Sequence, residues 1–175
     1  MAKIDLPENI LSDISEKEIP VWINPMLAKL THDYFSDPGW IYERKLDGER
    51  ALLFCTEGEV KLMSRNKKNL NKKYPELVEA FSERNSTNMI IDGEIVAFSG
   101  NVTDFSKLQK RMHRKEKNKK SKIKVYYYAF DIIHIENKDL SAVPLKYRKK
   151  ILRANVDFSH DQIRYLQKRN QKGAE

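Results

Sequence analysis

The sequence predicts an α+β fold in which mostly antiparallel sheets are flanked by helices. Stretches with strand patterns outnumber those with helical spacing. The strands follow one another in hairpins and show no regular β-α alternation, which favours antiparallel sheets. The chain of 175 residues is 40% hydrophobic and 33% charged, a composition typical of a globular protein with one sizeable core.

The first part of the chain is expected to form an arm and then β-structure. A short helix is expected over 7–17, and a turn-rich stretch follows it. Apolar-rich patterns predict strands over 40–46 and 50–56. The Glu-Gly dipeptide at 57–58 fits a two-residue hairpin turn, so a strand over 60–65 should pair with the one before it.

Helices and longer strands are expected in the rest of the chain. Apolar residues at three- and four-residue spacing predict helices over 74–84, 103–113 and 144–156. The first and last of these begin at or next to a proline, which the first helical turn tolerates. Apolar runs predict strands over 89–98 and 124–135, the second of which is long enough to be a buried central strand.

The net charge of +8 comes from one segment. Residues 107–124 hold ten Lys or Arg and one Glu, and within them 115–122 is expected to be an exposed loop. Such a segment suits a polyanion such as double-stranded nucleic acid. A solvated loop without a partner has the same composition, so the charge alone leaves both interpretations open.

The composition also excludes some classes of protein. No apolar run reaches the roughly 18 residues that span a bilayer, and no signal-peptide core is found in the first twenty residues. The single cysteine, Cys55, lies in a predicted strand, where we expect it to be buried, and cannot form an internal disulfide. The sequence therefore predicts a cytoplasmic protein.

An unusual group of charges lies at 43–50, ERKLDGER. Along an extended strand, Glu43, Lys45 and Asp47 would point to one side. Such a row can be a surface ion-pair ladder, or it can hold the lysine as a nucleophile. Gly48 matters because a glycine here permits a sharp turn or the close approach of a ligand to the backbone.

Three further short stretches add to this pattern. They are Ser64-Arg65-Asn66, Asp92-Gly93-Glu94 and Phe130-Asp131. Each is ordinary alone, because an aspartate at a strand end is usually a turn former and a strand phenylalanine is usually in the core. Together with the lysine they supply what a nucleoside triphosphate site needs. The ring can stack on a base, the cations can hold phosphates, and a carboxylate can bind ribose or a metal ion.

The motifs resemble those of a known family. KLDGER resembles the lysine motif KxDGxR of the covalent nucleotidyltransferases, which include ATP-dependent DNA ligases, RNA ligases and mRNA capping enzymes. SRN, DGE and YYAFDII resemble the next motifs, in the same order. PMLAKL, PELVEAF, FSKLQKRM and PLKYRKKIL are similar to the ligase module of prokaryotic end-joining DNA ligases, which favours a DNA ligase over the other two classes. The resemblance covers roughly residues 22–155.

The resemblance implies the N-terminal portion of an ATP-grasp-like nucleotidyltransferase domain and a role for each matched residue. Lys45 would be the catalytic nucleophile that attacks the α-phosphate of ATP and carries AMP covalently. Glu43 would accept a hydrogen bond from the adenine amino group, which favours ATP over GTP. Phe130 would stack on the adenine ring.

The remaining matched residues would contact the sugar and the phosphates. The resemblance implies that Arg50 and Arg65 touch ribose or phosphate and later the DNA 5′-phosphate. Glu94 would bind the ribose hydroxyl or a Mg²⁺ or Mn²⁺ ion. Asp47 would either orient the lysine or shape the turn. Nicked or broken double-stranded DNA is the implied partner, in repair, recombination or replication, and fused or associated end-joining or repair modules are compatible with it.

The resemblance divides the chain into an N-terminal arm, 1–21, and a partial adenylation domain, 22–175. The later Glu-Gly and Lys-x-Lys motifs of the family and its OB-fold domain are not found. We therefore expect these residues to self-adenylate weakly and not to complete nick sealing. The alternative function is that of a non-catalytic nucleic-acid-binding remnant that uses 107–124 as its contact.

Overall fold

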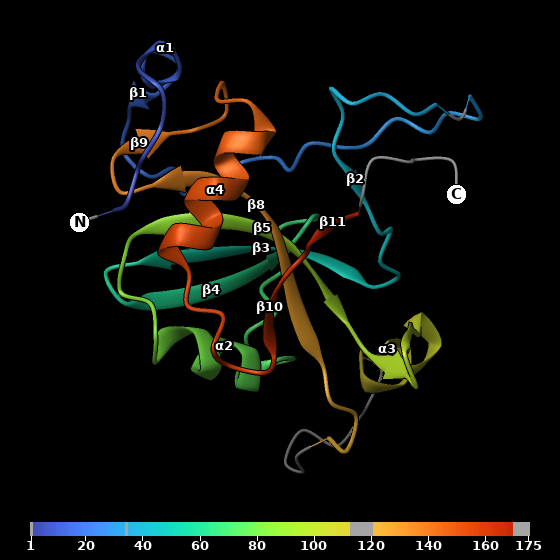
Figure 1. Cartoon of the computed structure of the whole chain (residues 1–175). Helices are drawn as coiled ribbons and strands as arrows, with labels where there is room; N and C mark the ends of the chain where they lie inside the picture. Colours follow the sequence, from blue (N-terminus) through green and yellow to red (C-terminus); the bar gives the residue numbers. More distant parts are fainter. Residues whose placement is uncertain (1, 34, 113–120, 170–175) are drawn as a thin grey trace.

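The structure is a computed structural model that describes residues 2–33, 35–112 and 121–169. Its largest element is a sheet of seven strands: β1 (Ser15–Glu16), β3 (Glu49–Thr56), β4 (Glu59–Ser64), β5 (Met89–Val96), β8 (Tyr126–Ile135), β9 (Lys138–Asp139) and β10 (Ile163–Tyr165). The order is β1-β9-β8-β5-β3-β4, and β10 pairs with β8 outside this path (Figure 1). All pairings are antiparallel except that of β8 with β10.

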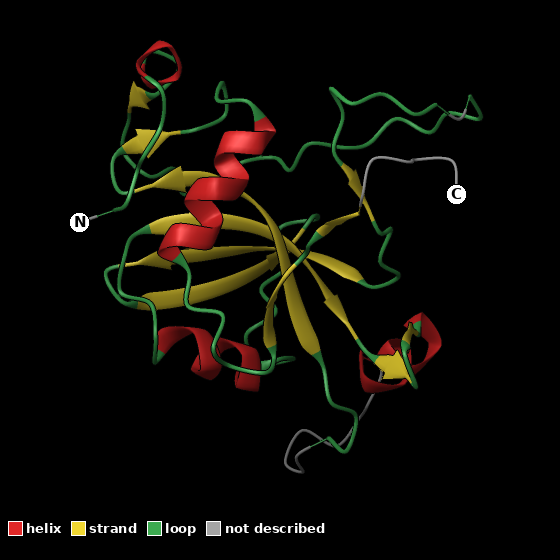
Figure 2. Cartoon of the chain, in the orientation of Figure 1, coloured by secondary structure: helices red, strands yellow, loops and turns green. Residues whose placement is uncertain are grey.

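Two small sheets and four helices complete the described fold. In the small sheets β2 (Tyr42–Glu43) pairs with β11 (Lys168–Arg169), and β6 (Phe98–Ser99) pairs with β7 (Val102–Thr103). The helices are α1 (Glu8–Leu11), α2 (Pro75–Ser82), α3 (Phe105–Met112) and α4 (Leu145–Asn155). Figure 2 shows α4 lying across the large sheet and α2 packed near its β4 edge. The predicted α+β class with mostly antiparallel sheets is confirmed.

The main core lies on the sheet face that α2 and α4 cover. On β3 it receives alternate residues, Ala51, Leu53 and Cys55, all fully buried. Helix α2 contributes Phe81, and helix α4 contributes Leu152, to the same cluster. Because side chains alternate along a strand, one strand face is committed to this core. The predicted burial of the cysteine in a strand is confirmed.

The opposite face of the sheet changes from apolar to charged along its length. At one end Leu52, Phe54 and Ile90 form a second cluster, covered by residues of the N-terminal segment that include Trp22. The Trp22 and Phe54 rings stack with centroids 6.0 Å apart. Further along the same face of β3 comes Arg50. The N-terminal segment thus covers the apolar end of this face, and the charged end is where the predicted motifs lie.

The hairpin between β3 and β4 forms as predicted. Thr56 pairs with Glu59, so two residues make the turn. Glu57 has φ 51° and Gly58 has φ 82°. Two consecutive positive φ angles are what a tight hairpin turn of this length requires, because their twist matches that of the strands.

Two predicted elements are shorter than expected. The helix expected over 7–17 ends at Leu11, because β1 pairs with β9 and Lys17 N donates to Asn137 O at 2.9 Å. The strand expected over 40–46 is limited to Tyr42–Glu43, because β2 leaves the main sheet and pairs with β11. In both cases pairing with a distant segment sets the boundary. Most of the loop expected over 115–122 lies outside the described residues.

No described helix is long and apolar enough to cross a membrane.

Candidate active site

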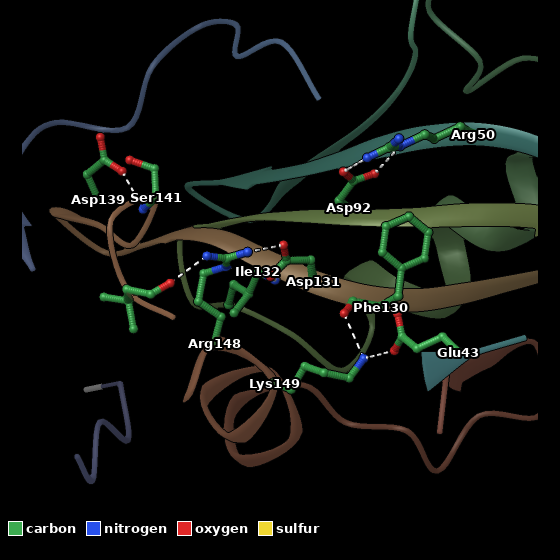
Figure 3. Close-up of polar contacts among 11 residues, drawn as sticks. Glu43, Arg50, Asp92, Phe130, Asp131, Ile132, Asp139, Ser141, Arg148 and Lys149 are labelled. Carbon is green, nitrogen blue, oxygen red and sulfur yellow. Dashed lines mark hydrogen bonds and ion pairs between the residues drawn. The ribbon is translucent and has the colours of Figure 1, made fainter. Parts of the chain in front are cut away.

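The site is built where β3 and β5 pair at the charged end of the sheet face. In their register Arg50 lies opposite Glu94, and Leu52 lies opposite Asp92. Arg50 reaches diagonally to Asp92, with Nε to Oδ1 at 3.0 Å and Nη2 to Oδ2 at 2.5 Å (Figure 3). This two-pronged contact fixes the guanidinium plane and raises the pKa of Arg50 above its ordinary value.

An irregularity in β8 brings Phe130 to the same place. Asp92 pairs with Asp131 and the next residue, Gly93, pairs with Ala129, so Phe130 is an extra residue in the ladder. A bulge of this kind bends a strand and re-aims a side chain, and such bulges are common beside active sites. The Arg50 guanidinium lies 5.4 Å from the centroid of the Phe130 ring. The charged end therefore includes an aromatic surface beside the bulge.

Glycine is required at two positions of the predicted motifs because other atoms lie too close for a side chain. A Cβ on Gly48 would lie 2.2 Å from the carbonyl oxygen of Ile95, so the chain before β3 runs directly against β5. A Cβ on Gly93 would lie 2.4 Å from the ring of Tyr127. Both glycines thus serve close packing of the backbone around the site.

Glu94 is the half-buried carboxylate of this group. Burial raises its pKa to about 7, and the neighbouring Arg50 opposes that shift. The charges of Lys45, Asp47 and Asp92 also act on it, which places all of them near one carboxyl group. A carboxyl group whose pKa burial raises to near neutral pH is typical of a functional site.

Lys45 lies in the short connection between β2 and β3 and is exposed. It is exposed because the strand stops at Glu43 and the chain there leaves the sheet. The connection is held on its far side, where Asp47 N donates to Thr103 Oγ1 at 3.3 Å. The lysine thus projects from an anchored loop beside Glu94.

Glu43 reaches the site from β2. Its carboxylate Oε1 accepts from the Nζ of Lys149 on α4, and the same ammonium group donates to the carbonyl oxygen of Phe130 at 2.9 Å. Figure 3 shows Phe130 between the Arg50–Asp92 pair and the Glu43–Lys149 pair. The structure therefore brings Glu43, Arg50, Glu94 and Phe130 together around the loop that carries Lys45.

Arg65 is the most peripheral of the predicted residues. It is exposed and follows the end of β4, where Ser64 pairs with Ala51. This register places Arg65 at the same end of the sheet as Arg50, at the start of a tight turn in which Ser64 N donates to Lys68 O at 2.9 Å. Its side chain can approach the site from the sheet edge.

The acidic groups can hold a metal ion only together with phosphate oxygens of a bound substrate. Among the described residues no group of three or more His, Cys, Asp or Glu side chains is placed to hold a metal. Both oxygens of Asp92 are already bound by Arg50, so Glu94 and the nearby exposed Asp47 are the carboxylates left to bind a metal ion. Mg²⁺ is commonly held by one or two carboxylates together with substrate phosphates. The arrangement fits that mode of binding.

Comparison with known proteins decides the family. A family model described as the ATP dependent DNA ligase domain matches residues 25–175. The chain belongs to the ATP-dependent DNA ligase domain family. The family predicted from the lysine motif and the motifs that follow it is confirmed, and with it the use of ATP by this class of domain.

Relatives of this ligase domain include two proteins named as DNA ligases or DNA ligase-like. It is 31% identical over 144 residues to the SPbeta prophage-derived DNA ligase-like protein LigB of Bacillus subtilis. This match covers 82% of this chain and 50% of LigB. It is 35% identical over 168 residues to the DNA ligase of Sulfurisphaera tokodaii. This match covers 87% of this chain and 27% of that protein. The chain thus spans half or less of the length of these curated relatives.

Solved structures support the fold of the ligase domain. Mycobacterial DNA ligase D, complexed with ATP and MES, aligns with a TM-score of 0.68 at 24% identity, over 86% of this chain and 47% of that one. The ligase domain of M. tuberculosis LigD aligns with a TM-score of 0.64 at 23% identity, over 82% of this chain and 45% of that one. At these identities the likeness shows the shared fold.

Two buried cations of the ligase domain were missed by the sequence analysis. Arg148 donates to both oxygens of Asp131, at 2.8 and 2.7 Å, and Lys149 binds Glu43. A signal for both was present in the helical spacing. Arg148 and Lys149 share one helical face with the apolar residues Leu145 and Leu152 of α4. Cations on a buried face require acidic partners, so this face predicts ion pairs even before their partners are known.

Much of the described part of the basic segment is occupied by internal contacts. Arg111 donates to the carbonyl oxygens of Ile123 and Lys73, at 3.0 Å each. Lys107 donates to Phe98 O at 2.7 Å. These cations tie α3 to its neighbours. Residues 113–120 of the segment lie outside the described part of the chain.

Proposed function

We propose that this chain is the adenylation part of an ATP-dependent DNA ligase, in which Lys45 forms a covalent adduct with AMP. The observation that carries the proposal is the convergence of Arg50, Glu94 and Phe130 around the loop of Lys45, at the end of the sheet face that the N-terminal segment leaves uncovered. Three sequence motifs that are far apart in the chain meet at this place.

The reaction proposed for Lys45 is a displacement at phosphorus. The neutral amine attacks the α-phosphate of ATP, the bond to pyrophosphate breaks, and a P–N bond to the lysine forms as the amine loses a proton. An exposed amine on a loop anchored at Asp47 can reach a phosphate without the rest of the sheet moving. Positioning of this kind supplies much of the acceleration in phosphoryl-type transfers.

The surrounding residues would bind the nucleotide. Phe130 would stack on adenine, and the carboxylate of Glu43 would accept from the adenine amino group. Arg50, already oriented by Asp92, would contact ribose or phosphate, and Arg65 would approach from the sheet edge. These roles agree with where the side chains lie.

Glu94 would contact either the ribose hydroxyls or a metal ion. A Mg²⁺ or Mn²⁺ ion bound with ATP would neutralise phosphate charge and polarise the phosphoryl group. Because its carboxyl group is half-buried, Glu94 binds such a ligand best once it has lost its proton, at neutral or higher pH. Binding of the nucleotide and its metal ion at Glu94 is therefore expected to be tighter at pH 8 than at pH 6.

We further propose that the adenylate is passed to the 5′-phosphate of nicked or broken double-stranded DNA. The names of the relatives, DNA ligase and DNA ligase-like protein, support this substrate. The expected setting is DNA repair, recombination or replication in the cytoplasm, with end-joining or repair modules as partners. The division into an arm, 1–21, and an adenylation domain, 22–175, belongs to the same proposal.

Intact mass measurement tests the first step. The protein is incubated with ATP and Mg²⁺ or Mn²⁺ and compared with Lys45→Ala and with Lys61→Ala, which alters an exposed lysine of β4. We expect the mass to rise by one AMP in the wild type and in Lys61→Ala and to stay unchanged in Lys45→Ala. Peptide mapping of the adduct should locate AMP on Lys45.

Two results would contradict the proposal. An adduct that persists in Lys45→Ala would show that another side chain is the nucleophile. The absence of an adduct in the folded wild type, with either metal and at pH 8, would show that these residues do not perform the step.

A further inference from the structure

Lys149 is a buried cation that joins three separate parts of the fold. Its side chain is 5% exposed. The ammonium group donates to the carboxylate of Glu43 in β2, to the carbonyl oxygen of Phe130 in β8 at 2.9 Å, and to the carbonyl oxygen of Leu166, after β10, at 3.4 Å. An ammonium group has three hydrogens to donate, so these contacts use its full capacity.

Two of these three partners belong to the residues proposed to hold adenine. Lys149 binds the side chain of Glu43 and the backbone of Phe130, and Figure 3 shows both contacts converging on one nitrogen. The lysine thereby fixes the distance between the carboxylate and the aromatic ring. The Lys149 nitrogen also lies 5.0 Å from the ring centroid of Tyr165, so this ring covers the ammonium group as well.

The neighbouring ion pair of α4, between Arg148 and Asp131, differs from the Lys149–Glu43 pair in how many carboxylate oxygens are bound. Arg148 binds both oxygens of Asp131, whose side chain is 13% exposed. Lys149 binds Oε1 of Glu43, whose side chain is 22% exposed, and Oε2 accepts no hydrogen bond from the described residues. In the first pair both carboxylate oxygens are occupied by the cation. The second pair leaves one carboxylate oxygen able to accept a further hydrogen bond.

That remaining oxygen can distinguish two purine bases. Adenine carries an amino group at position 6, which donates, and guanine carries a carbonyl oxygen there, which accepts. A carboxylate held in place as an acceptor favours the first and repels the second. Discrimination depends on the carboxylate staying where it is, because a mobile one can turn away from the carbonyl oxygen.

We infer that Lys149 is a positioning residue that sets the preference for ATP over GTP by holding Glu43 against Phe130. The inference rests on the proposed function, since it requires that the nucleotide base lies between these two residues. It predicts that the lysine acts through Glu43 and makes no contact with the nucleotide.

A set of four variants tests this role. Lys149→Met removes the ammonium group, Glu43→Gln removes the carboxylate charge, and the double variant removes both. Lys150→Met is the matched control, because Lys150 is the next residue on α4 and is exposed. Circular dichroism establishes folding for each. Isothermal titration with ATP and with GTP, without a metal ion so that no AMP adduct forms, gives the ratio of the two affinities.

We expect Lys149→Met to lower the ATP-to-GTP affinity ratio roughly tenfold, the size of a strong interaction between residues in contact. Glu43→Gln should lower it by a similar factor. The double variant should match Glu43→Gln alone, since no carboxylate is left for the lysine to hold in place. Lys150→Met should keep the wild-type ratio, and Lys149→Arg, which retains a donor and the charge, should recover most of the preference.

The outcomes separate the inference from the proposed function. If the wild type binds ATP in preference to GTP and Lys149→Met keeps the same ratio, the positioning role is overturned and the proposed function stands. If the wild type neither binds ATP nor forms the AMP adduct, the proposed function fails and the inference fails with it. Should Lys149→Met not fold, the comparison of Glu43→Gln with the double variant decides. The double variant leaves no buried charge, and in Glu43→Gln the ammonium group keeps the carbonyl oxygens of Phe130 and Leu166 as acceptors. Different ratios in that pair would refute the inference.

Discussion

Glu94→Gln replaces a carboxyl group that the fold holds partly away from water with a neutral group of the same shape. Burial raises the pKa of Glu94 from 4.5 to about 7. The folded protein therefore keeps this proton up to about pH 7, whereas the unfolded chain releases it near pH 4.5. Because the folded state binds more protons in that window, the free energy of unfolding of the wild type falls as the pH rises through it.

The magnitude follows from the pKa values. One pKa unit corresponds to about 1.36 kcal/mol, so a change from 4.5 to about 7 corresponds to about 3 kcal/mol. Glu94 is only half-buried, and solvent screening reduces this to about 2 kcal/mol. Glutamine does not titrate, so Glu94→Gln should match the wild type at pH 4.5 and exceed its stability by about 2 kcal/mol at pH 7.5.

Urea denaturation followed by circular dichroism, between pH 4.5 and 7.5, measures this difference. Other titrating groups contribute to both curves and largely cancel in the comparison. Glu59→Gln is the control, because the side chain of Glu59 is 77% exposed, and its curve should follow that of the wild type. Parallel curves for Glu94→Gln and the wild type would refute the assignment of a raised pKa to Glu94. A gain in stability on removal would indicate that the carboxylate is kept for binding, at a cost to the fold.

Two further substitutions test the packing around the site. Gly48→Ala should destabilise the protein by about 1–3 kcal/mol and reduce AMP adduct formation, because its Cβ would meet a backbone oxygen at 2.2 Å. At Gly100 an added Cβ meets no atom within 4 Å but φ is 59°, so Gly100→Ala should cost about 1 kcal/mol and leave the adduct unchanged by mass spectrometry. Arg148→Met should lower the free energy of unfolding in urea by about 3–5 kcal/mol, because it leaves Asp131 buried without its cation. Arg153→Met, at an exposed position of the same helix, should change it by less than about 1 kcal/mol.

The hairpin of β3 and β4 shows what local sequence can determine. Apolar residues on both sides of Glu57-Gly58 predict two strands, and the dipeptide predicts the turn. All the interactions that define this unit lie within about 16 residues of chain. Cys55 could likewise be assigned to the core because it lies in the middle of such a strand.

Phe130 shows where local sequence is insufficient. In the apolar run of β8 a phenylalanine is expected to belong to the core, and its neighbour Asp131 to a turn. Its ring instead lies against Arg50, beside the bulge opposite Asp92 and Gly93. The bulge arises from how β8 pairs with β5, some 37 residues away in the chain, and no periodicity within β8 encodes it.

Helix α4 lies between these two cases. Its amphipathic pattern predicts the helix and places Arg148 and Lys149 on the buried face. Their partners, Asp131 and Glu43, are 17 and 106 residues away. Charge chemistry required acidic partners, and only the packing of α4 on β8 and β2 decided which carboxylates they would be.

The sequence by itself determined the order of the longer strands and the helices, the position of the tight turn, the family and the set of residues in its motifs. These follow from hydrophobic periodicity and from short motifs, in which each residue is specified by its neighbours in the chain. The tertiary structure decided that β2 leaves the main sheet, that Lys45 is exposed on an anchored loop, and that one buried lysine holds Glu43 and Phe130 together. These features depend on pairing and packing between segments that are distant in the chain, and local sequence does not specify the register or the partner of such contacts.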